Sequence, residues 1–550
     1  MPTLEVSHSD LCSLIGKKLT IDELKQYILF AKAEIDDVQG DLIKIDSKDT
    51  NRPDLWSAEG IARELSGRLT SKRGLPKYDI DISDVVVKVD KKVSKPRPLT
   101  VCAVAKNLDL NETVLSQMIQ LQEKVAGTFG RGRKEVAIGV YDLSKIKSPI
   151  QYTTAKLDKK FVPLDFEEEM TIKEILEKHP KGKEFGYLVE GLKEIPIFID
   201  CNGEVLSIPP IINSNYTGKV TEGTKQVFIE CSGFNFKFLM PAINVLVAAL
   251  IDRGAKVESV VVEYPRKTLY TPDLTPKKTS VDVDLVNKIS GLKLSSKEII
   301  NLLEQARYDV KKIKGKKIEL LYPAYRQDIM HPRDVVEDVI ISFGYNKIEP
   351  EPIKFKTKGE INKSEGLTDN IIKKMVELGF QEILSYTLTN KDNLFKRMNL
   401  KEDRVVEIEN PVSMNWNVFR NWLLPSLMEF YSNNQHVEYP QRIFEVGDVV
   451  LIDEKQETKT RDVRKIAAAV ANSRISYDDI AAVLDVFLSS LKIKYKLKKT
   501  KHGSFIEGRV AEVLVKNKPI GFIGEIHTSV LSNWKLEMPV AAFEISLEIF

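Results

Sequence analysis

The sequence predicts an α+β protein built of several domains. With 550 residues, the chain is long enough for three or four compact domains rather than one. Segments with a period of two, typical of half-buried strands, alternate with segments of helical periodicity along the chain. Near the carboxy terminus, several predicted strands follow one another through short turns such as the one at 517–519. This order favours a largely antiparallel sheet.

The composition excludes several classes of protein. Apolar residues make up 43% of the chain and charged residues 29%, which are ordinary values for a globular protein and argue against general disorder. The 82 basic and 79 acidic residues give a net charge of +3. This balance is no evidence for nucleic-acid binding, although it does not exclude local basic stripes.

The cysteines and the apolar stretches indicate the compartment. The four cysteines form no C-x-x-C pair and have no nearby histidine partner, so neither a zinc site nor a disulfide framework is expected. The amino terminus lacks a signal-peptide pattern, and the longest apolar stretch, 241–251, is too short to span a bilayer. We therefore expect a cytoplasmic protein that does not bind membranes.

The first expected domain, residues 1–90, mixes helices and strands. The pattern predicts helices over 21–33 and 58–66, the second one following a polar turn with the sequence DTNRPDLW. The lysine- and proline-rich stretch at 91–98 predicts the next boundary, because proline interrupts both helices and sheet ladders.

The second expected domain, residues 91–265, is a larger mixed α/β unit. We expect strands at 100–106, 135–141, 196–200, 227–231 and 257–264, and helices at 111–126, 171–178 and 238–253. The turn GRGRKE concentrates Arg131, Arg133 and Lys134, which either contact a nucleic-acid phosphate or are simply solvated.

A polar segment in this domain, 203–235, is a candidate pocket. It carries hydroxyls, an amide and one carboxylate around a Pro-Pro turn and a short strand: Ser207, Asn213, Ser214, Thr217, Thr221, Thr224, Glu230 and Ser232. No Ser-His-Asp or Cys-His combination is present, so hydrolysis here would rely on a positioned water molecule. The alternative is a polar loop followed by an ordinary edge strand.

The third expected domain, residues 268–348, is a small winged-helix-like module. An alternating strand at 279–286 precedes a helix whose start carries a Ser295–Glu298 capping box. A hairpin that turns at 314–315 and a second helix from Pro332 follow.

Four carboxylates gather at the start of the last of these helices. Asp334, Glu337 and Asp338 are spaced i, i+3 and i+4, and Asp328 lies on the preceding segment. Such a cluster calls for a cation, and its hard oxygen ligands suit Mg²⁺. The alternative is that the helix dipole stabilises the three acids of the first turns without any metal.

The fourth expected domain, residues 355–550, alternates strands with amphipathic helices. The strands are expected at 382–389, 442–450, 465–471, 509–515, 520–526 and 540–545.

Several of these motifs together resemble the β subunit of archaeal and eukaryotic-type phenylalanyl-tRNA synthetase along essentially the whole chain. They occur in the family's order: DTNRPDLWSAEGIARELSG, GRGRKEVAIGVYDL, LSIPPIINSNYTGKVT, YRQDIMHPRDVVEDV with FGYNKI, ENPVSMNWNVFRNWLLPSL, YPQRIFEVGDVV and IGFIGEIHTSVLSNW.

The resemblance implies a partner. In that family an α subunit carries the class II active site and forms an α₂β₂ heterotetramer with β. The resemblance implies that this chain binds tRNA and that phenylalanine and ATP bind through the α subunit. Residues 355–550 lack the glycine-rich strand–helix element with its ATP-binding arginine. The fourth domain is therefore expected to be a class II catalytic-like antiparallel-sheet domain without catalytic motifs, serving as a subunit interface.

The resemblance also assigns roles to the candidate residues. Asp328, Asp334, Glu337 and Asp338 match a Mg²⁺ site shared with the α subunit, and residues 91–265 are similar to an editing domain. Ser207, Asn213, Glu230 and Ser232 would surround its pocket, where mischarged tyrosyl-tRNA is hydrolysed. A pocket for phenylalanine rejects tyrosine only about a hundredfold, which explains the need for editing. The alternative is a non-enzymatic scaffold or tRNA-binding paralogue with an inert pocket.

Overall fold

The computed structural model describes residues 2–353 and 357–548. The chain forms two compact units, Met1–Pro352 and Ile353–Phe550. The first unit covers the residues of the first three expected domains, and the second covers those of the fourth. The expected limits of the fourth domain, Phe355 and Phe550, lie outside the described residues.

The amino-terminal part of the first unit contains a three-stranded antiparallel sheet that the sequence did not predict. Its order is β1-β3-β2, with β1 (Thr3–Ser7), β2 (Ala33–Gln39) and β3 (Leu42–Ser47). The helices are α1 (His8–Ile15), α2 (Ile21–Tyr27) and α3 (Ala58–Leu69). The helix predicted at 58–66 is confirmed as α3. The one predicted over 21–33 is too long, because the chain turns through the short 3₁₀ helix Ile28–Ala31 and then enters β2.

The middle of the first unit is a ten-stranded mixed sheet. Nine strands follow the order β12-β11-β10-β7-β4-β14-β5-β13-β6, and β15 pairs with β14. Their bounds are β4 (Asp81–Val89), β5 (Leu99–Lys106), β6 (Val136–Asp142), β7 (Ile150–Lys156), β10 (Glu194–Ile199), β11 (Val205–Ile208), β12 (Ile212–Asn213), β13 (Gln226–Gly233), β14 (Lys256–Tyr264) and β15 (Lys267–Thr271). The small pair β8 (Lys160–Phe161) and β9 (Met170–Thr171) lies apart from this sheet.

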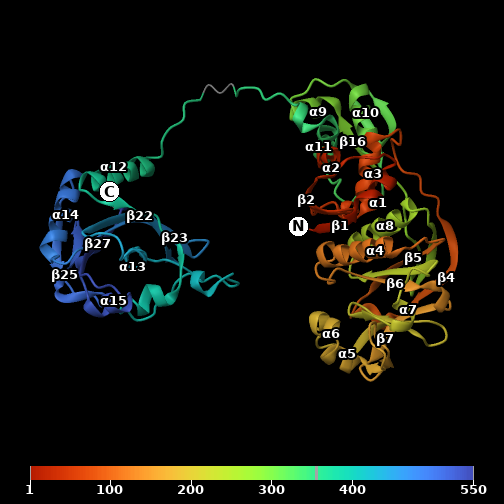
Figure 1. Cartoon of the computed structure of the whole chain (residues 1–550), viewed down its shortest axis with the longest axis horizontal. Helices are drawn as coiled ribbons and strands as arrows, with labels where there is room; N and C mark the ends of the chain where they lie inside the picture. The colour runs from red at the N-terminus through yellow and green to blue at the C-terminus, as the bar shows by residue number, and fades with distance from the viewer. Residues whose placement is uncertain (1, 354–356, 549–550) are drawn as a thin grey trace. The chain divides into compact units, whose positions relative to one another are not determined.

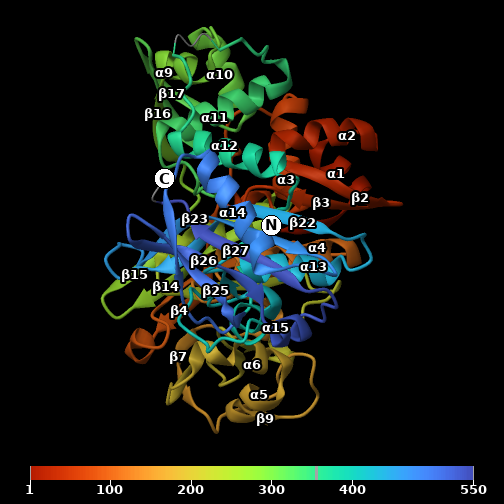
Figure 2. The same ribbon diagram turned by 90° about the vertical axis from the view of Figure 1, so that its left-hand side faces the viewer.

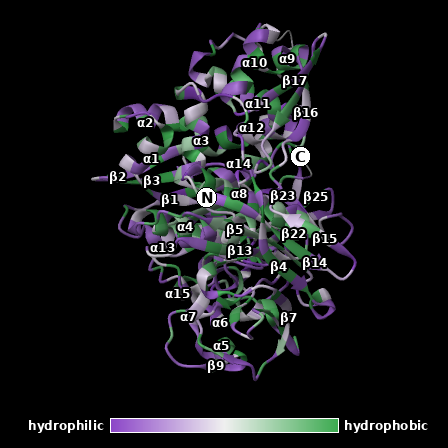
Figure 3. Cartoon of the chain, turned by 90° about the vertical axis from the view of Figure 1, so that its right-hand side faces the viewer, coloured by the Kyte–Doolittle hydropathy of each residue, from purple (hydrophilic) through white to green (hydrophobic). Residues whose placement is uncertain are grey.

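Helices pack against this sheet and bury its apolar side chains. The helices are α4 (Glu112–Lys124), α5 (Ile172–Lys178), α6 (Pro180–Phe185), α7 (Asn215–Gly218) and α8 (Phe236–Asp252). Figure 1 shows α4 and α8 beside β5 and β6, and α8 shares a buried cluster with the apolar side chains of β5 and β13. Figure 3 shows α8 in the colour of hydrophobic residues, as expected for a helix that is buried along most of its length.

The strands predicted for the second domain are confirmed as β5, β6, β10, β13 and β14, each within two residues. The boundary expected at 90/91, however, falls inside the sheet. Strand β4 pairs in parallel with β14 and with β7, so it belongs with the strands that follow the proline-rich stretch. Local composition could not reveal this, because the pairing joins segments that are far apart in the chain.

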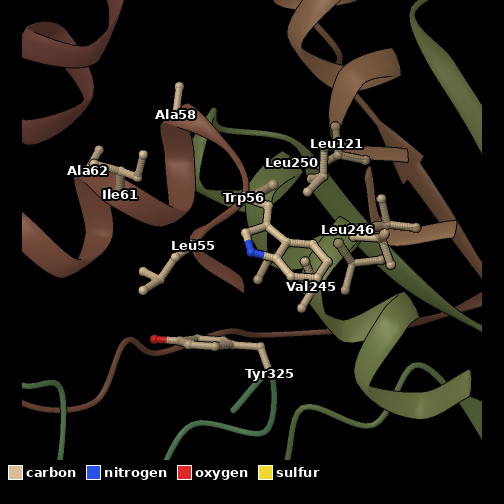
Figure 4. Packing of buried hydrophobic residues seen from close by; sticks show 14 of the residues in the cluster. Leu55, Trp56, Ala58, Ile61, Ala62, Leu121, Val245, Leu246, Leu250 and Tyr325 are labelled. Carbon is tan, nitrogen blue, oxygen red and sulfur yellow. The ribbon is translucent and has the colours of Figure 1, made fainter. Parts of the chain in front are cut away.

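One tryptophan joins the amino-terminal part to the large sheet domain. Trp56 lies in the turn before α3 and is fully buried. Figure 4 shows its indole beside Val245, Leu246 and Leu250 of α8, with Tyr325 nearby. The motif DTNRPDLW therefore places an aromatic side chain in a core that three parts of the first unit share.

The last part of the first unit is a small module with three strands and three helices. Its sheet has the order β16-β18-β17, with β16 (Lys277–Asp282), β17 (Asp309–Lys314) and β18 (Lys317–Tyr322), and its helices are α9 (Val283–Ser290), α10 (Ser296–Gln305) and α11 (Pro332–Phe343). The hairpin, the capping box of α10 and the start of α11 at Pro332 are as predicted. The strand predicted at 279–286 is confirmed for residues 279–282 and wrong for residues 283–286, which lie in α9. It ends at Asp282, whose side chain accepts a hydrogen bond from Asp284 N–H and thereby caps α9.

The second unit is built on a seven-stranded sheet in which only the pair β19–β22 is parallel. The order is β19-β22-β23-β27-β26-β25-β24, with β19 (Gln381–Glu382), β22 (Gln441–Ile452), β23 (Thr460–Ala471), β24 (Tyr495–Lys499), β25 (Phe505–Val515), β26 (Lys518–Ile526) and β27 (Val540–Ser546). Figure 2 shows β23, β25, β26 and β27 side by side. The predicted antiparallel sheet is confirmed.

Helices flank this sheet on both faces. They are α12 (Lys363–Glu377) and α14 (Tyr477–Ser490) in one buried cluster, and α13 (Leu424–Asn433) and α15 (Thr528–Asn533) in another. The single strand predicted at 382–389 is wrong. Two short strands stand in its place, because β19 pairs with β22 whereas β20 (Leu388–Thr389) pairs with β21 (Val418–Phe419). Among the described residues, we find no helix whose length and hydropathy would suit a bilayer crossing.

Candidate functional site

Three of the four predicted pocket residues line one cavity. Ser207, Asn213 and Glu230 share a cavity of about 220 Å³ in the first unit. Ser207 on β11 is paired directly with Asn213 on β12, and Glu230 lies in the middle of β13. The polar segment of the sequence therefore wraps around a pocket. Since β13 runs between β5 and β6, the alternative of an ordinary edge strand is wrong.

Curling of the sheet closes this cavity. Strands β12 and β6 are the two ends of the strand order, yet Asn213 Nδ2 donates to the carbonyl oxygen of Val140 on β6 at 3.4 Å. From the GRGRKE turn, Arg133 Nη1 donates to the carbonyl oxygen of Ile211 at 2.9 Å. The two ends of the sheet thus face each other across the pocket.

Glu230 is the most unusual side chain of the pocket. It is 1% exposed, and among the described residues its Oε2 has no hydrogen-bond partner. Burial raises the pKa of Glu230 to about 8, which outweighs the opposing effect of the nearby Arg97 charge. The carboxyl group is therefore mostly protonated at neutral pH.

The fourth predicted residue, Ser232, does not line the cavity. It lies two positions further along β13, is fully buried, and its Oγ accepts a hydrogen bond from Arg97 Nε at 3.1 Å. Arg97 also donates to the carbonyl oxygens of Ser232, Arg133 and Lys134. Ser232 is thus covered by a guanidinium group that is itself 2% exposed.

Two side chains at this site escaped the sequence analysis. Arg97 belongs to the proline-rich stretch that predicts a domain boundary, and Tyr141 is predicted only as the last residue of a strand. The Tyr141 hydroxyl donates to Ser207 Oγ at 2.7 Å and lies 3.3 Å from Glu230 Oε1. The signal that could have found it is the spacing of Gly139 and Tyr141, two positions apart on one face of β6.

The structure does not bring the four predicted metal ligands together. Asp328 accepts two hydrogen bonds from Arg326, whose Nη2 also donates to Asp338 Oδ2 at 2.9 Å. Asp334 Oδ2 accepts from the backbone N–H groups of Met330 and His331 and caps α11. Glu337 Oε1 is paired with Lys32 Nζ at 3.0 Å.

Each carboxylate of this cluster is therefore already bound by a group of the protein, and Asp328 and Asp338 share Arg326. Burial disfavours the charged form of Asp328, but the guanidinium groups of Arg326 and Arg52 prevail and lower its pKa to about 2. In the part of the chain that the structure describes, no three His, Cys, Asp or Glu side chains are grouped so that they could hold a metal. This donor set does not fit the expected Mg²⁺ ion, and the carboxylates instead bind arginine, lysine and backbone N–H groups.

The second unit exposes apolar side chains on two neighbouring segments. Leu384 and Tyr386 precede β20, and Val412, Met414 and Trp416 precede β21. We call these five residues the apolar patch. The ring centroids of Tyr386 and Trp416 lie 5.1 Å apart in an edge-to-face arrangement, so the two segments form one surface. Large exposed apolar surfaces commonly mark interaction sites.

Comparison with known protein families covers most of the chain. Three family models match: a B3/4 domain at residues 107–240, a tRNA synthetase B5 domain at 279–345, and the CLM domain of the phenylalanyl-tRNA synthetase beta chain at 348–547. The phenylalanine–tRNA ligase beta subunit of Pyrococcus abyssi is 52% identical over the whole chain and 99% of its own length. This chain belongs to the phenylalanine–tRNA ligase beta-subunit family. The chain is therefore a subunit of an aminoacyl-tRNA ligase.

Further relatives extend this beta-subunit assignment. The phenylalanine–tRNA ligase beta subunit of Korarchaeum cryptofilum is 39% identical over all of this chain and 99% of its own length. A crystal structure of an N-terminal fragment of the Pyrococcus horikoshii beta subunit is 52% identical, matches with a TM-score of 0.61, and covers 62% of this chain and 100% of the fragment. The B3/4 match contains the whole Ser207–Asn213–Glu230 cavity, and the B5 match contains the acidic cluster.

Proposed function

We propose that this beta subunit hydrolyses mischarged tyrosyl-tRNA in the cavity between β11, β12 and β13. The observation that carries the proposal is the convergence of Ser207, Asn213 and the buried acid Glu230 on one cavity. A cavity of about 150 Å³ already holds a benzene molecule, so the space of about 220 Å³ accommodates an aromatic side chain. Its polar groups suit an amino acid that carries a hydroxyl.

The physical need for such a site follows from the chemistry of phenylalanine selection. An apolar pocket shaped for phenylalanine discriminates poorly against a ligand that merely adds one hydroxyl. A second pocket that hydrogen-bonds the hydroxyl discriminates strongly, because its buried polar groups would remain unpaired with phenylalanine. The described cavity provides such groups without a protein nucleophile. Hydrolysis would therefore proceed by attack of a bound water molecule on the ester.

The proposal is tested by measuring deacylation of the phenylalanine-specific tRNA after it has been charged with tyrosine. The complex with the α subunit should release tyrosine much faster than phenylalanine, and Asn213→Ala and Glu230→Ala should each reduce the rate at least tenfold. Asn202→Ala is the control, since Asn202 lies in the exposed turn before β11 and outside the cavity, and it should retain most of the activity. Deacylation that is equal in all four proteins would show an inert pocket and favour the scaffold alternative.

We also propose that the second unit docks an α subunit in an α₂β₂ heterotetramer that binds tRNA, phenylalanine and ATP. The apolar patch supports this, because Val412 and Leu384 are among the most exposed apolar side chains of the described residues. Tyr386→Glu should weaken co-purification of the α subunit. Leu497→Glu is the matched control, since Leu497 is an exposed apolar residue on β24, outside the patch. Equal recovery of α with both variants would exclude the patch.

A further inference from the structure

The position of Tyr141 is determined by a glycine. Gly139 and Tyr141 are on the same face of β6, and a Cβ atom at Gly139 would lie 2.0 Å from the Tyr141 hydroxyl oxygen and 2.5 Å from Cζ. The phenol ring therefore lies back along its own strand, over the space that a side chain at 139 would fill. Gly139 is also the residue paired with Glu230 on β13. This is why the hydroxyl of Tyr141 reaches the Glu230 carboxyl.

The Tyr141 hydroxyl connects two groups of the cavity but has only one hydrogen. Its oxygen lies 2.7 Å from Ser207 Oγ and 3.3 Å from Glu230 Oε1. If the hydrogen goes to Ser207, a hydrogen bond with Glu230 requires that Glu230 be the donor, and so protonated. If Glu230 is ionised, Tyr141 donates to Glu230, and Ser207 can then donate to Tyr141. The charge of Glu230 therefore sets the direction of both hydrogen bonds.

The surroundings of Glu230 favour the protonated form. The charged or titratable groups packed against it are Arg97 before β5, Cys102 on β5, Tyr141 on β6, Tyr152 on β7 and its neighbour Cys231. Across the cavity the charged side chains are Glu123, Arg133, Asp165 and Lys181. The hydrogen bonds of Arg97 go to Ser232 and to backbone carbonyls, so this cation does not pair directly with Glu230. The pKa of about 8 that burial gives Glu230 agrees with this geometry.

We propose that Tyr141 is a positioning residue that transmits the protonation state of Glu230 to Ser207. At neutral pH the Glu230 acid donates to Tyr141, and Tyr141 donates to Ser207. The hydrogen of Ser207 is then free to bind an acceptor oxygen of the ligand in the cavity. When Glu230 loses its proton to solvent, both hydroxyls keep one hydrogen but turn, and Ser207 becomes an acceptor towards the ligand.

We call this chain of hydrogen bonds from Glu230 through Tyr141 to Ser207 the relay. It rests on the proposed function only for the nature of the ligand, an aminoacyl group. Its first test is the pH profile of tyrosyl-tRNA deacylation by the α-containing complex, corrected for hydrolysis without enzyme. The wild-type rate should fall at least fivefold as the pH rises through about 8. Glu230→Gln should be faster than Glu230→Ala and should lose this fall, because its amide N–H donates to Tyr141 at every pH. Tyr141→Phe should be at least tenfold slower and should lack the fall.

Either of two results would overturn the relay in this assay. One is a Glu230→Gln variant as inactive as Glu230→Ala, which would mean that the carboxylate itself is required. The other is a Tyr141→Phe variant with the wild-type pH profile. Glu230→Gln and Tyr141→Phe each keep the size of the buried side chain, so loss of folding does not explain either result.

A second measurement separates the relay from the editing proposal. The unfolding temperature of the full chain is followed from pH 6 to 9.5 for the wild type, Glu230→Gln and Tyr141→Phe. The wild type should lose stability relative to Glu230→Gln as the pH rises from 6 towards about 8, and the loss should level off above that pH because folded Glu230 is then ionised too. Tyr141→Phe should shift the pH at which the loss levels off by more than half a unit. Parallel curves for all three would overturn the relay. If the titration and its shift appear but tyrosyl-tRNA is not deacylated, the relay stands and the editing proposal fails.

Discussion

Arg326 Nη2 donates to Asp338 Oδ2 at 2.9 Å, and both side chains are buried, Arg326 on the segment before α11 and Asp338 within the helix. The same guanidinium group holds Asp328, and the Tyr308 hydroxyl donates to the same oxygen of Asp338 at 2.6 Å. The positive charge that the acidic cluster requires therefore comes from an arginine two residues before Asp328. Removing a carboxylate from this arrangement leaves buried charge without its full set of partners.

Asp338→Ala should destabilise the first unit by about 3 to 5 kcal/mol, because it removes one partner of a buried arginine. Asp334→Ala is the matched control on the same helix. It removes an exposed cap and should cost only about 1 kcal/mol. Urea denaturation of the full chain, monitored by tryptophan fluorescence, measures both. Equal losses for the two variants would contradict the buried ion pair.

Removal of divalent cations should leave the unfolding temperature of the chain unchanged. The carboxylates at α11 are already matched by Arg326, Arg52 and Lys32, so a metal would have to displace these groups. Calorimetry with EDTA and with added Mg²⁺ checks this. A stabilisation by Mg²⁺ that disappears in Asp338→Ala would show that a metal does bind at the cluster.

Acid should weaken the contribution of Asp328. Its pKa is lowered from 3.8 to about 2 in the folded chain, so its stabilising effect is complete above pH 4 to 5 and is lost as the pH falls through about 2. This shift corresponds to roughly 2 kcal/mol. The wild type should therefore lose more stability than Asp328→Asn between pH 5 and pH 3. An identical pH dependence in the two proteins would show that Asp328 has an ordinary pKa.

Gly139→Ala should destabilise the first unit by about 1 to 3 kcal/mol, because the new methyl group occupies the place of the Tyr141 ring. Gly127→Ala is the control, since a Cβ atom there meets no neighbour within 4 Å. It should be neutral or slightly stabilising. Thermal unfolding of both variants compares the two positions. A Gly139→Ala variant as stable as Gly127→Ala would mean that Tyr141 can move aside at little cost.

Local sequence patterns correctly predicted the elements that begin or end at characteristic capping, proline or glycine residues. The capping box of Ser295 and Glu298, the proline at the start of α11 and the glycine in the β17–β18 turn each act within a few residues, and all three features are present. The strand expected at 279–286 failed for a similarly local reason. Alternation alone did not reveal that Asp282 would end the strand by capping a helix.

The sequence by itself determined the α+β class, half of the strands of the ten-stranded sheet and most of those of the seven-stranded sheet, and the polar character of the segment that carries Ser207, Asn213 and Glu230. Only the tertiary structure decided that β12 meets β6, that Tyr141 lies between Ser207 and Glu230, and that Arg326 neutralises the acidic cluster. The reason is physical. Periodicity and capping depend on neighbours in the chain, whereas the closing of a sheet and the choice of a charge partner depend on packing between distant segments.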